Sequence, residues 1–186
     1  MYLFGYGSLI NLISAQKSFK REISYTDLIP VYVNGYEKVW NSIEHIQFDE
    51  QDVNGVFLNL KKDDSATTNG VVVKITDEEF EILKLREKNY SCISIKKEQV
   101  TNVKLDEDLV AFMTTNTQKI AKAGDETCFI PTKYVDILTS SFEFYNDEFV
   151  NDYKKCLIDL PFTLKEGTYK FSDPIQNKFA KEGVKK

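Results

Sequence analysis

Histidine and cysteine are scarce in this 186-residue chain, which limits the chemistry that its side chains can perform. His45 is the single histidine, so sites that need two imidazoles, such as the HExxH zinc arrangement, are excluded. The three cysteines, Cys92, Cys128 and Cys156, are odd in number and far apart, which predicts neither a disulfide framework nor a close metal-ligand pair. We therefore expect buried, reduced thiols, a structural or exposed histidine, no metal and no cofactor.

An excess of basic residues and a long apolar run are also missing. The net charge of −5 gives no broad attraction to nucleic acid or to anionic lipid. No apolar run approaches the roughly 18 to 20 residues that span a bilayer, and Met1 leads into a strand-like segment without signal-peptide features. We expect a cytoplasmic protein with a small-molecule partner, and neither nucleic acid nor a membrane. The oligomeric state stays open.

The first half of the chain is rich in strand-like segments. Residues 2–6 predict a buried strand, and residues 11–20 a short helix or irregular turn. In LIPVYVNGYEKVW, two β-rich runs flank Asn34-Gly35, a dipeptide typical of a tight hairpin. VNGVFLNL and GVVVKI predict two further strands separated by a polar turn, KKDDSATTN. These segments predict a largely antiparallel sheet.

Helices are expected in the middle and near the end of the chain. Thr76 followed by Glu79 forms a capping-box pattern that starts a helix over about 77–86. SCISIKKEQV and DLVAFMTT then predict strands, and two helices follow Pro131. The fold class is therefore α+β with a small barrel-like sheet. Residues 1–160 are expected to form one domain, and residues 161–186 a loosely docked C-terminal extension.

The turn after the first strand is the first candidate site. Gly5-Tyr6-Gly7-Ser8 is not a dinucleotide fingerprint, because Ile10 stands where the third glycine belongs and no strand-helix-strand pattern follows. Such a turn can point successive backbone N–H groups at a carboxylate or a developing oxyanion. Alternatively, its glycines serve only a tight turn that packs Tyr6 and Leu9 into the core.

The second candidate is Glu87, a carboxylate at the C-terminal end of the predicted mid-chain helix, where the helix dipole disfavours it. An exposed glutamate paired with Lys84 or Lys88 explains the same pattern. Three further carboxylates compete for a functional role, and the last two are expected to be solvated on the helix: Glu44, Glu79 and Glu81. Tyr36 and Trp40 are expected to pack in the core rather than to line a pocket.

Six segments, in this order, resemble the γ-glutamylcyclotransferase superfamily, which includes AIG2-like and ChaC-like proteins: FGYGSLI, VNGYEKVW, NGVFLNL, GVVVKI, LREKNY and PTKY. The opening segment and the RE…Y element are most similar to the ChaC-type branch. The resemblance implies a small mixed or antiparallel β-barrel with a mid-chain helix and C-terminal helices. It also implies that Glu87 is the catalytic acid and base. The substrate-binding residues that it implies are Tyr6, Gly7, Ser8, Leu9, Tyr90 and Tyr134.

The reaction that this resemblance implies needs no metal and no enzyme nucleophile. The α-amine of a γ-glutamyl compound attacks its own side-chain amide and releases 5-oxoproline and an amine. Intramolecular attack of this kind can reach effective molarities of roughly 10⁵ to 10⁸ M. The leaving group stays open between a peptide, an amino acid and a polyamine. A noncatalytic module that binds a metabolite or a protein partner on the same fold is the alternative.

Overall fold

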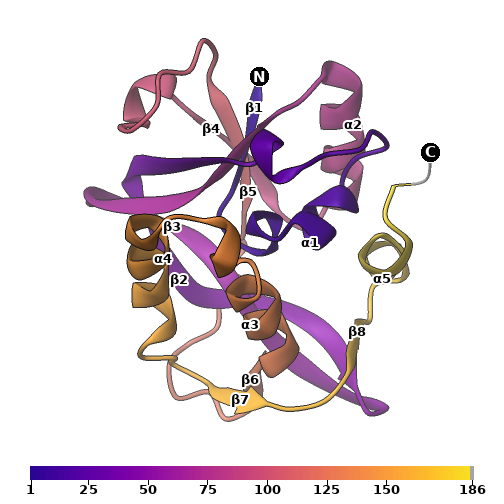
Figure 1. The fold of residues 1–186 in the computed structure, drawn as a ribbon. Coiled ribbons are helices and arrows are strands. Elements are labelled where there is room, and N and C mark those ends of the chain that lie inside the picture. The colour runs from indigo at the N-terminus through magenta and orange to yellow at the C-terminus, as the bar shows by residue number, and fades with distance from the viewer. Residues whose placement is uncertain (185–186) are drawn as a thin grey trace.

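The computed structural model describes residues 1–184 and has the expected α+β class, with one mixed sheet and several helices (Figure 1). The main path of the sheet runs β4-β5-β1-β3-β2-β8, while β6 pairs with β3 and β7 pairs with β6. The strands are β1 Tyr2–Gly5, β2 Ile29–Phe48, β3 Gln51–Lys74, β4 Ser91–Ile95, β5 Leu109–Met113, β6 Cys128–Pro131, β7 Thr163–Lys165 and β8 Tyr169–Phe171. β1 lies antiparallel to β3 and parallel to β5, so the first strand is central and fully buried.

Two long strands replace the four short ones that the sequence predicted. β2 and β3 form one antiparallel hairpin, and its turn lies at Asp49 and Glu50, both with positive φ. Gly35 does have positive φ, but it sits in a bulge where the register jumps from Asn34 opposite Thr67 to Tyr36 opposite Lys62. The expected hairpin at Asn34-Gly35 and the expected strand break in KKDDSATTN are therefore wrong. Asn34-Gly35 in β2 and the KKDDSATTN segment in β3 lie opposite each other in one β-bulge. This bulge bends the two strands without ending them.

The mid-chain helix is confirmed with its expected bounds. α2 spans Asp77–Arg86 and begins with the capping box between Thr76 and Glu79. Glu79 was expected to be solvated, but only 14% of its side chain is exposed because it also pairs with Arg21. Glu81 is exposed and pairs with Lys84, as expected for the outer face of the helix.

Helices cover the sheet and complete the core. α1 Leu12–Gln16 follows the opening turn, and α3 Thr132–Thr139 and α4 Asp147–Lys154 are the two helices expected after Pro131. Tyr153 of α4 is fully buried, and Trp40 packs edge-on against Tyr134 in the core. Among residues 1–184, no helix has both the length and the apolar character to span a membrane. Short 3₁₀ helices span Ser8–Ile10, Tyr25–Asp27, Lys97–Gln99, Thr117–Lys119, Phe142–Phe144 and Lys155–Leu157.

The end of the chain is more ordered than the sequence predicted. β7 pairs in parallel with β6, and β8 pairs with β2 between residues 46 and 48. α5, Pro174–Glu182, then lies beside α1 and α2 (Figure 1). The residues after Pro161 are thus attached to the sheet, which corrects the expectation of a loosely docked extension.

The thiols and the histidine lie in different surroundings. All three cysteines are free, but only Cys128 is buried; Cys156 is half-buried and Cys92 is exposed, so the expectation of burial was wrong for Cys92. His45 is exposed, and its Nδ1 lies 3.0 Å from Oδ1 of Asn54, which agrees with a structural or exposed histidine.

Candidate active site

A cavity of about 650 Å³ opens beside β1, between α1, α2, α3 and the C-terminal segment. A cavity of this size lies within the roughly 300 to 1,000 Å³ that is typical of small-molecule sites. All seven residues that the sequence singled out line it: Tyr6, Gly7, Ser8, Leu9, Glu87, Tyr90 and Tyr134. The fold therefore brings together residues from three distant parts of the chain.

The glycine turn forms one side of the cavity. β1 ends at Gly5, and the chain enters a short 3₁₀ helix over Ser8–Ile10 whose first internal bond runs from the N–H of Ile10 to the carbonyl of Gly7. The amides at the start of such a helix have no acceptor within it. The backbone N–H groups of Gly7, Ser8 and Leu9 lie at this start, and all three residues line the cavity.

Gly7 is required by a close approach, not by its backbone angles. Gly7 has a φ of −109°, which lies outside the left-handed region that favours glycine. A Cβ on Gly7 would instead lie 2.7 Å from the hydroxyl oxygen of Tyr134, and ordinary side chains do not approach so closely. The bare backbone therefore lets the turn lie directly against the tyrosine that faces it.

Tyrosine hydroxyls hold this turn in place from behind. Tyr153 donates a 2.6 Å hydrogen bond to the carbonyl of Tyr6, and Tyr145 donates one of 2.5 Å to the carbonyl of Ile10. Tyr6 in turn donates to the carbonyl of Phe112 in β5. The sequence reasoning missed both residues: Tyr153 lies on the buried face of α4, Tyr145 lies in the segment just before that helix, and neither belongs to a motif.

Glu87 is the first residue after α2, and its N–H closes the helix by donating to the carbonyl of Leu83. Its Oε1 lies 3.1 Å from Nε of Arg86, and 24% of the Glu87 side chain is exposed. Burial in the cavity wall raises the pKa of Glu87, the Arg86 guanidinium opposes this rise, and the Glu44 carboxylate adds to it. The competing pairing with Lys84 or Lys88 is not observed, since these two lysines bind Glu81 and Asp173.

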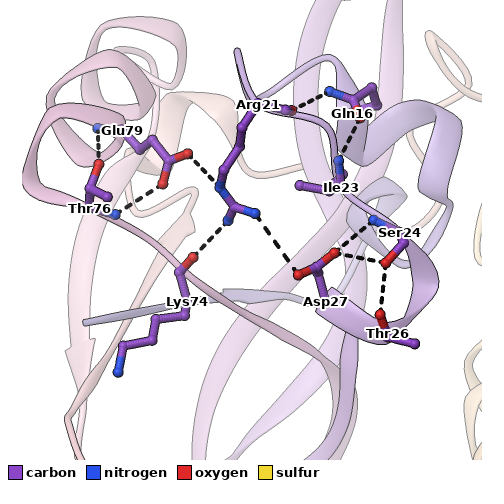
Figure 2. Close-up of polar contacts among 9 residues, drawn as sticks. All are labelled: Gln16, Arg21, Ile23, Ser24, Thr26, Asp27, Lys74, Thr76 and Glu79. Carbon is purple, nitrogen blue, oxygen red and sulfur yellow. Dashed lines mark hydrogen bonds and ion pairs between the residues drawn. The ribbon is translucent and has the colours of Figure 1, made fainter.

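Both ends of α2 are tied to the segment that follows the glycine turn. At its start, the Arg21 guanidinium binds Oε1 of Glu79 at 2.9 Å and the carbonyl of Lys74 at 2.9 Å, with Asp27 4.0 Å away (Figure 2). At its end, Arg86 donates to the hydroxyl of Ser18, a buried residue. The position of Glu87 relative to the turn is thus fixed through both helix ends.

Two tyrosines line the same cavity as Glu87, and a buried carboxylate lies near enough to change its pKa. Burial raises the pKa values of Tyr90 and Tyr134, so both hydroxyls are protonated at neutral pH. Glu44 is buried and its Oε2 pairs with Lys119 at 3.2 Å, while its Oε1 has no hydrogen-bond partner among the described residues. The Glu44 carboxylate raises the pKa values of both Glu87 and Tyr90 without lining the cavity itself.

Cationic side chains dominate the charge around the cavity. Among residues 1–184, five cationic residues and one carboxylate residue, Glu87, line it; the cationic residues are Lys17, Arg86, Lys133, Lys170 and Lys181. The surplus is local, because the whole chain carries a net charge of −5. Such a concentration of one sign in a cleft favours ligands of the opposite charge. The cavity is therefore suited to a small anion, such as an amino acid derivative with a free carboxylate.

The sequence reasoning also missed the residues that the C-terminal segment adds to the cavity. Tyr169, Phe171 and Gln176 line it from β8 and α5. α5 has an N-cap signal that sequence reasoning could have used, because Asp173 precedes Pro174 and its carboxylate accepts from two backbone amides. β7 and β8, with three residues each, are too short to give a periodic signal.

Fold and cavity together define an α+β protein with a cavity of the size typical of small-molecule sites and Glu87 in its lining. More specifically, the chain belongs to the family of ChaC-like proteins, because the model of that family matches residues 1–162. No curated protein matches the sequence. Among residues 1–184, no group of three or more His, Cys, Asp and Glu side chains is arranged to hold a metal ion.

Solved structures support the fold. YkqA from Bacillus subtilis matches with a TM-score of 0.62 and 21% identity over 87% of this chain, which spans only 55% of YkqA. A protein described as a gamma-glutamyl cyclotransferase matches with a TM-score of 0.57 and 14% identity, over 97% of this chain and 98% of its own. The human protein loc79017 gives a TM-score of 0.58 and 15% identity, with the same coverage of both chains. At these identities the likeness concerns the fold.

Proposed function

We propose that this protein is a γ-glutamylcyclotransferase, which converts a γ-glutamyl amide into 5-oxoproline and a free amine. The observation that carries this proposal is the meeting of Glu87, whose pKa is raised, with the glycine turn and Tyr134 around one cavity. Membership of the ChaC-like family and the fold shared with a gamma-glutamyl cyclotransferase support it.

Glu87 is the proton carrier in this proposal. An α-amine with a pKa of roughly 8 is mostly protonated at neutral pH and cannot attack until it loses a proton. That proton goes to solvent. As the neutral amine nitrogen then forms a bond to the γ-carbonyl carbon, the carboxylate of Glu87 accepts the second proton that this nitrogen must lose. The carbon–nitrogen bond to the leaving amine breaks as Glu87 returns the proton to that nitrogen. A raised pKa suits this double role, because it brings the acid and base forms closer in energy at neutral pH.

The glycine turn stabilises the intermediate in this proposal. Attack on the γ-carbonyl moves negative charge onto its oxygen, and the amides of Gly7, Ser8 and Leu9, at the start of the 3₁₀ helix, are suitable donors to it. Each such donor contributes on the order of 3 kcal/mol to an oxyanion. The protonated hydroxyl of Tyr134, next to Gly7, is a further donor. The cationic lining supplies attraction for the α-carboxylate that every γ-glutamyl compound carries.

A substrate panel tests this proposal. Glutathione and a γ-glutamyl dipeptide are expected to release 5-oxoproline, while their N-acetylated analogues are not, because acetylation removes the nucleophilic lone pair. Exhaustive chelation is expected to leave the rate unchanged. Turnover of an acetylated analogue, or a loss on chelation that zinc restores, would reject cyclisation in favour of hydrolysis. Binding without turnover would instead support a noncatalytic metabolite-binding module.

A further inference from the structure

The C-terminal wall is the side of the cavity that the proposed mechanism does not use. We give this name to the cavity-lining residues Tyr169, Phe171, Gln176, Asn177, Ala180 and Lys181. All of them lie after residue 162, where the match to the ChaC-like family model ends. The residues proposed for the chemistry all lie before that point. The wall therefore lies outside the stretch that the family model matches, while the other sides of the cavity lie within it.

The wall is fixed to the cavity at both of its ends. β8 pairs with β2, and the rings of Tyr169 and Phe171 lie 5.8 Å and 5.7 Å from that of Phe57. At the other end, Lys17 donates a 2.7 Å hydrogen bond to the carbonyl of Ala180, and Val184 donates back to the carbonyl of Lys17. The wall is therefore a built surface of the cavity.

Gln176 carries an unused acceptor in this surface. Its Oε1 is buried and has no hydrogen-bond partner among the described residues. Buried polar atoms are almost always paired, so this oxygen, on a residue that lines the cavity, is available to accept a hydrogen bond from a ligand. The charged residues that line the cavity from the wall and from the rest of β8 are both cations, Lys181 and Lys170. The surface thus offers one acceptor for an N–H group and positive charge for a carboxylate.

We infer that the C-terminal wall binds the leaving-amine half of the substrate and selects leaving groups that carry a carboxylate; this inference rests on the proposed function. The γ-glutamyl half must lie against the glycine turn and Glu87, where its carbonyl reacts. A cavity of about 650 Å³ leaves room beyond it for a group of amino acid or dipeptide size. Gln176 Oε1 accepts an N–H of that group, and Lys181 attracts its carboxylate. A polyamine, which is cationic, is disfavoured.

The test compares two substrates that differ only in the leaving group: a γ-glutamyl dipeptide, and the same dipeptide with its terminal carboxylate converted to an amide. We expect Gln176→Leu to raise KM for both by about tenfold with kcat nearly unchanged. Lys181→Met is expected to raise KM several-fold for the dipeptide only. Lys178→Met, an exposed lysine on the same helix that does not line the cavity, is the matched control and is expected to change neither.

The possible failures are distinguishable. If the wild type turns over the dipeptide and both wall variants keep its KM and its preference for a carboxylate, the inference is wrong and the proposed function stands. If the wild type binds without turnover, the dissociation constants measured by titration calorimetry replace KM in the same comparison. If it neither turns over nor binds γ-glutamyl compounds, the proposed function falls, and the inference falls with it. Thermal melts of each variant confirm that a changed KM is not a loss of fold.

Discussion

The two sides of the cavity differ in how firmly the fold holds them. The turn side depends on Tyr153, which is fully buried and bonded to the carbonyl of Tyr6. The C-terminal wall depends on a three-residue strand and on α5, which contains no fully buried residue. Reacting atoms need a fixed geometry, whereas a surface that contacts a variable group tolerates adjustment. Under the proposed function, the chemistry and the recognition of the leaving group therefore lie on different sides of the cavity. The substitutions below test this separation.

Loss of the carboxylate of Glu87 is expected to have the largest effect. Glu87→Gln keeps the shape of the side chain but cannot accept a proton, so kcat should fall by roughly 10² to 10⁴-fold while a γ-glutamyl ligand still binds. Steady-state rates and ligand titrations measure the two quantities separately. Retained turnover in this variant would remove Glu87 from the mechanism.

The same variant makes a prediction about stability. Because the pKa of Glu87 is raised in the folded chain above its ordinary 4.5, the unfolded chain loses this proton at a lower pH than the folded one. The charged, buried carboxylate therefore costs stability above that range and nothing below it. The melting temperature of Glu87→Gln should exceed that of the wild type at pH 7, and the difference should vanish below the ordinary pKa. A lower melting temperature at pH 7 would show that the carboxylate stabilises the fold.

The close approach of the turn to Tyr134 predicts a coupled pair of changes. The added Cβ of Gly7→Ala meets the Tyr134 hydroxyl, which lies 2.7 Å from its position, and the resulting shift of the turn should lower kcat/KM by about 10²-fold. Tyr134→Phe removes that oxygen and with it one proposed donor, so it should cost less activity in the Gly7→Ala variant than in the wild type. A double-mutant cycle measures this coupling. Additive losses would show that the contact does not set the position of the turn.

The charges around Glu87 predict opposite shifts of the pH profile. Arg86 lowers the pKa of Glu87 and Glu44 raises it. Arg86→Gln should therefore move the acid limb of kcat/KM to higher pH, and Glu44→Gln should move it to lower pH. Lys181→Met in the C-terminal wall should leave the pH of the acid limb of kcat/KM unchanged. Shifts of the same sign in the first two variants would mean that the limb reports another group.

The ties between α2 and the segment after the turn predict the smallest effect. Arg21 holds Glu79 and the carbonyl of Lys74, but its side chain is 40% exposed, and exposed ion pairs contribute little (Figure 2). Arg21→Met should lower the free energy of unfolding by no more than about 1 kcal/mol, as measured by urea denaturation. A loss several times larger would make this network a main support of α2.

Local sequence signals predicted the turn side of the cavity and Glu87 better than they predicted the C-terminal wall. The capping-box pattern at Thr76 and Glu79 predicted the start of α2. The predicted length of that helix placed Glu87 at its C-terminal end. The hairpin was misplaced because its positive φ values fall on Asp49 and Glu50, neither of which is the glycine that such turns favour. Gly35 has the expected φ, yet long-range pairing with β3 turns it into a bulge.

The wall could not be predicted because its contacts are long-range. The aromatic rings of β8 have no periodic pattern over three residues, and only their pairing with β2 brings them to the cavity. The same holds for Tyr145 and Tyr153, whose hydroxyls bond to backbone carbonyls more than a hundred positions earlier in the chain. A residue that acts through a backbone carbonyl leaves no motif, because any sequence supplies the acceptor.

The central claim is that the substrate's own amine, and not water, attacks the γ-carbonyl. Measuring 5-oxoproline, free glutamate and the released amine together, in one reaction with a γ-glutamyl dipeptide, tests it most directly. The account predicts 5-oxoproline and amine in equal amounts, no free glutamate, and loss of both products in Glu87→Gln. Free glutamate in place of 5-oxoproline would contradict the account and show that the cavity activates water.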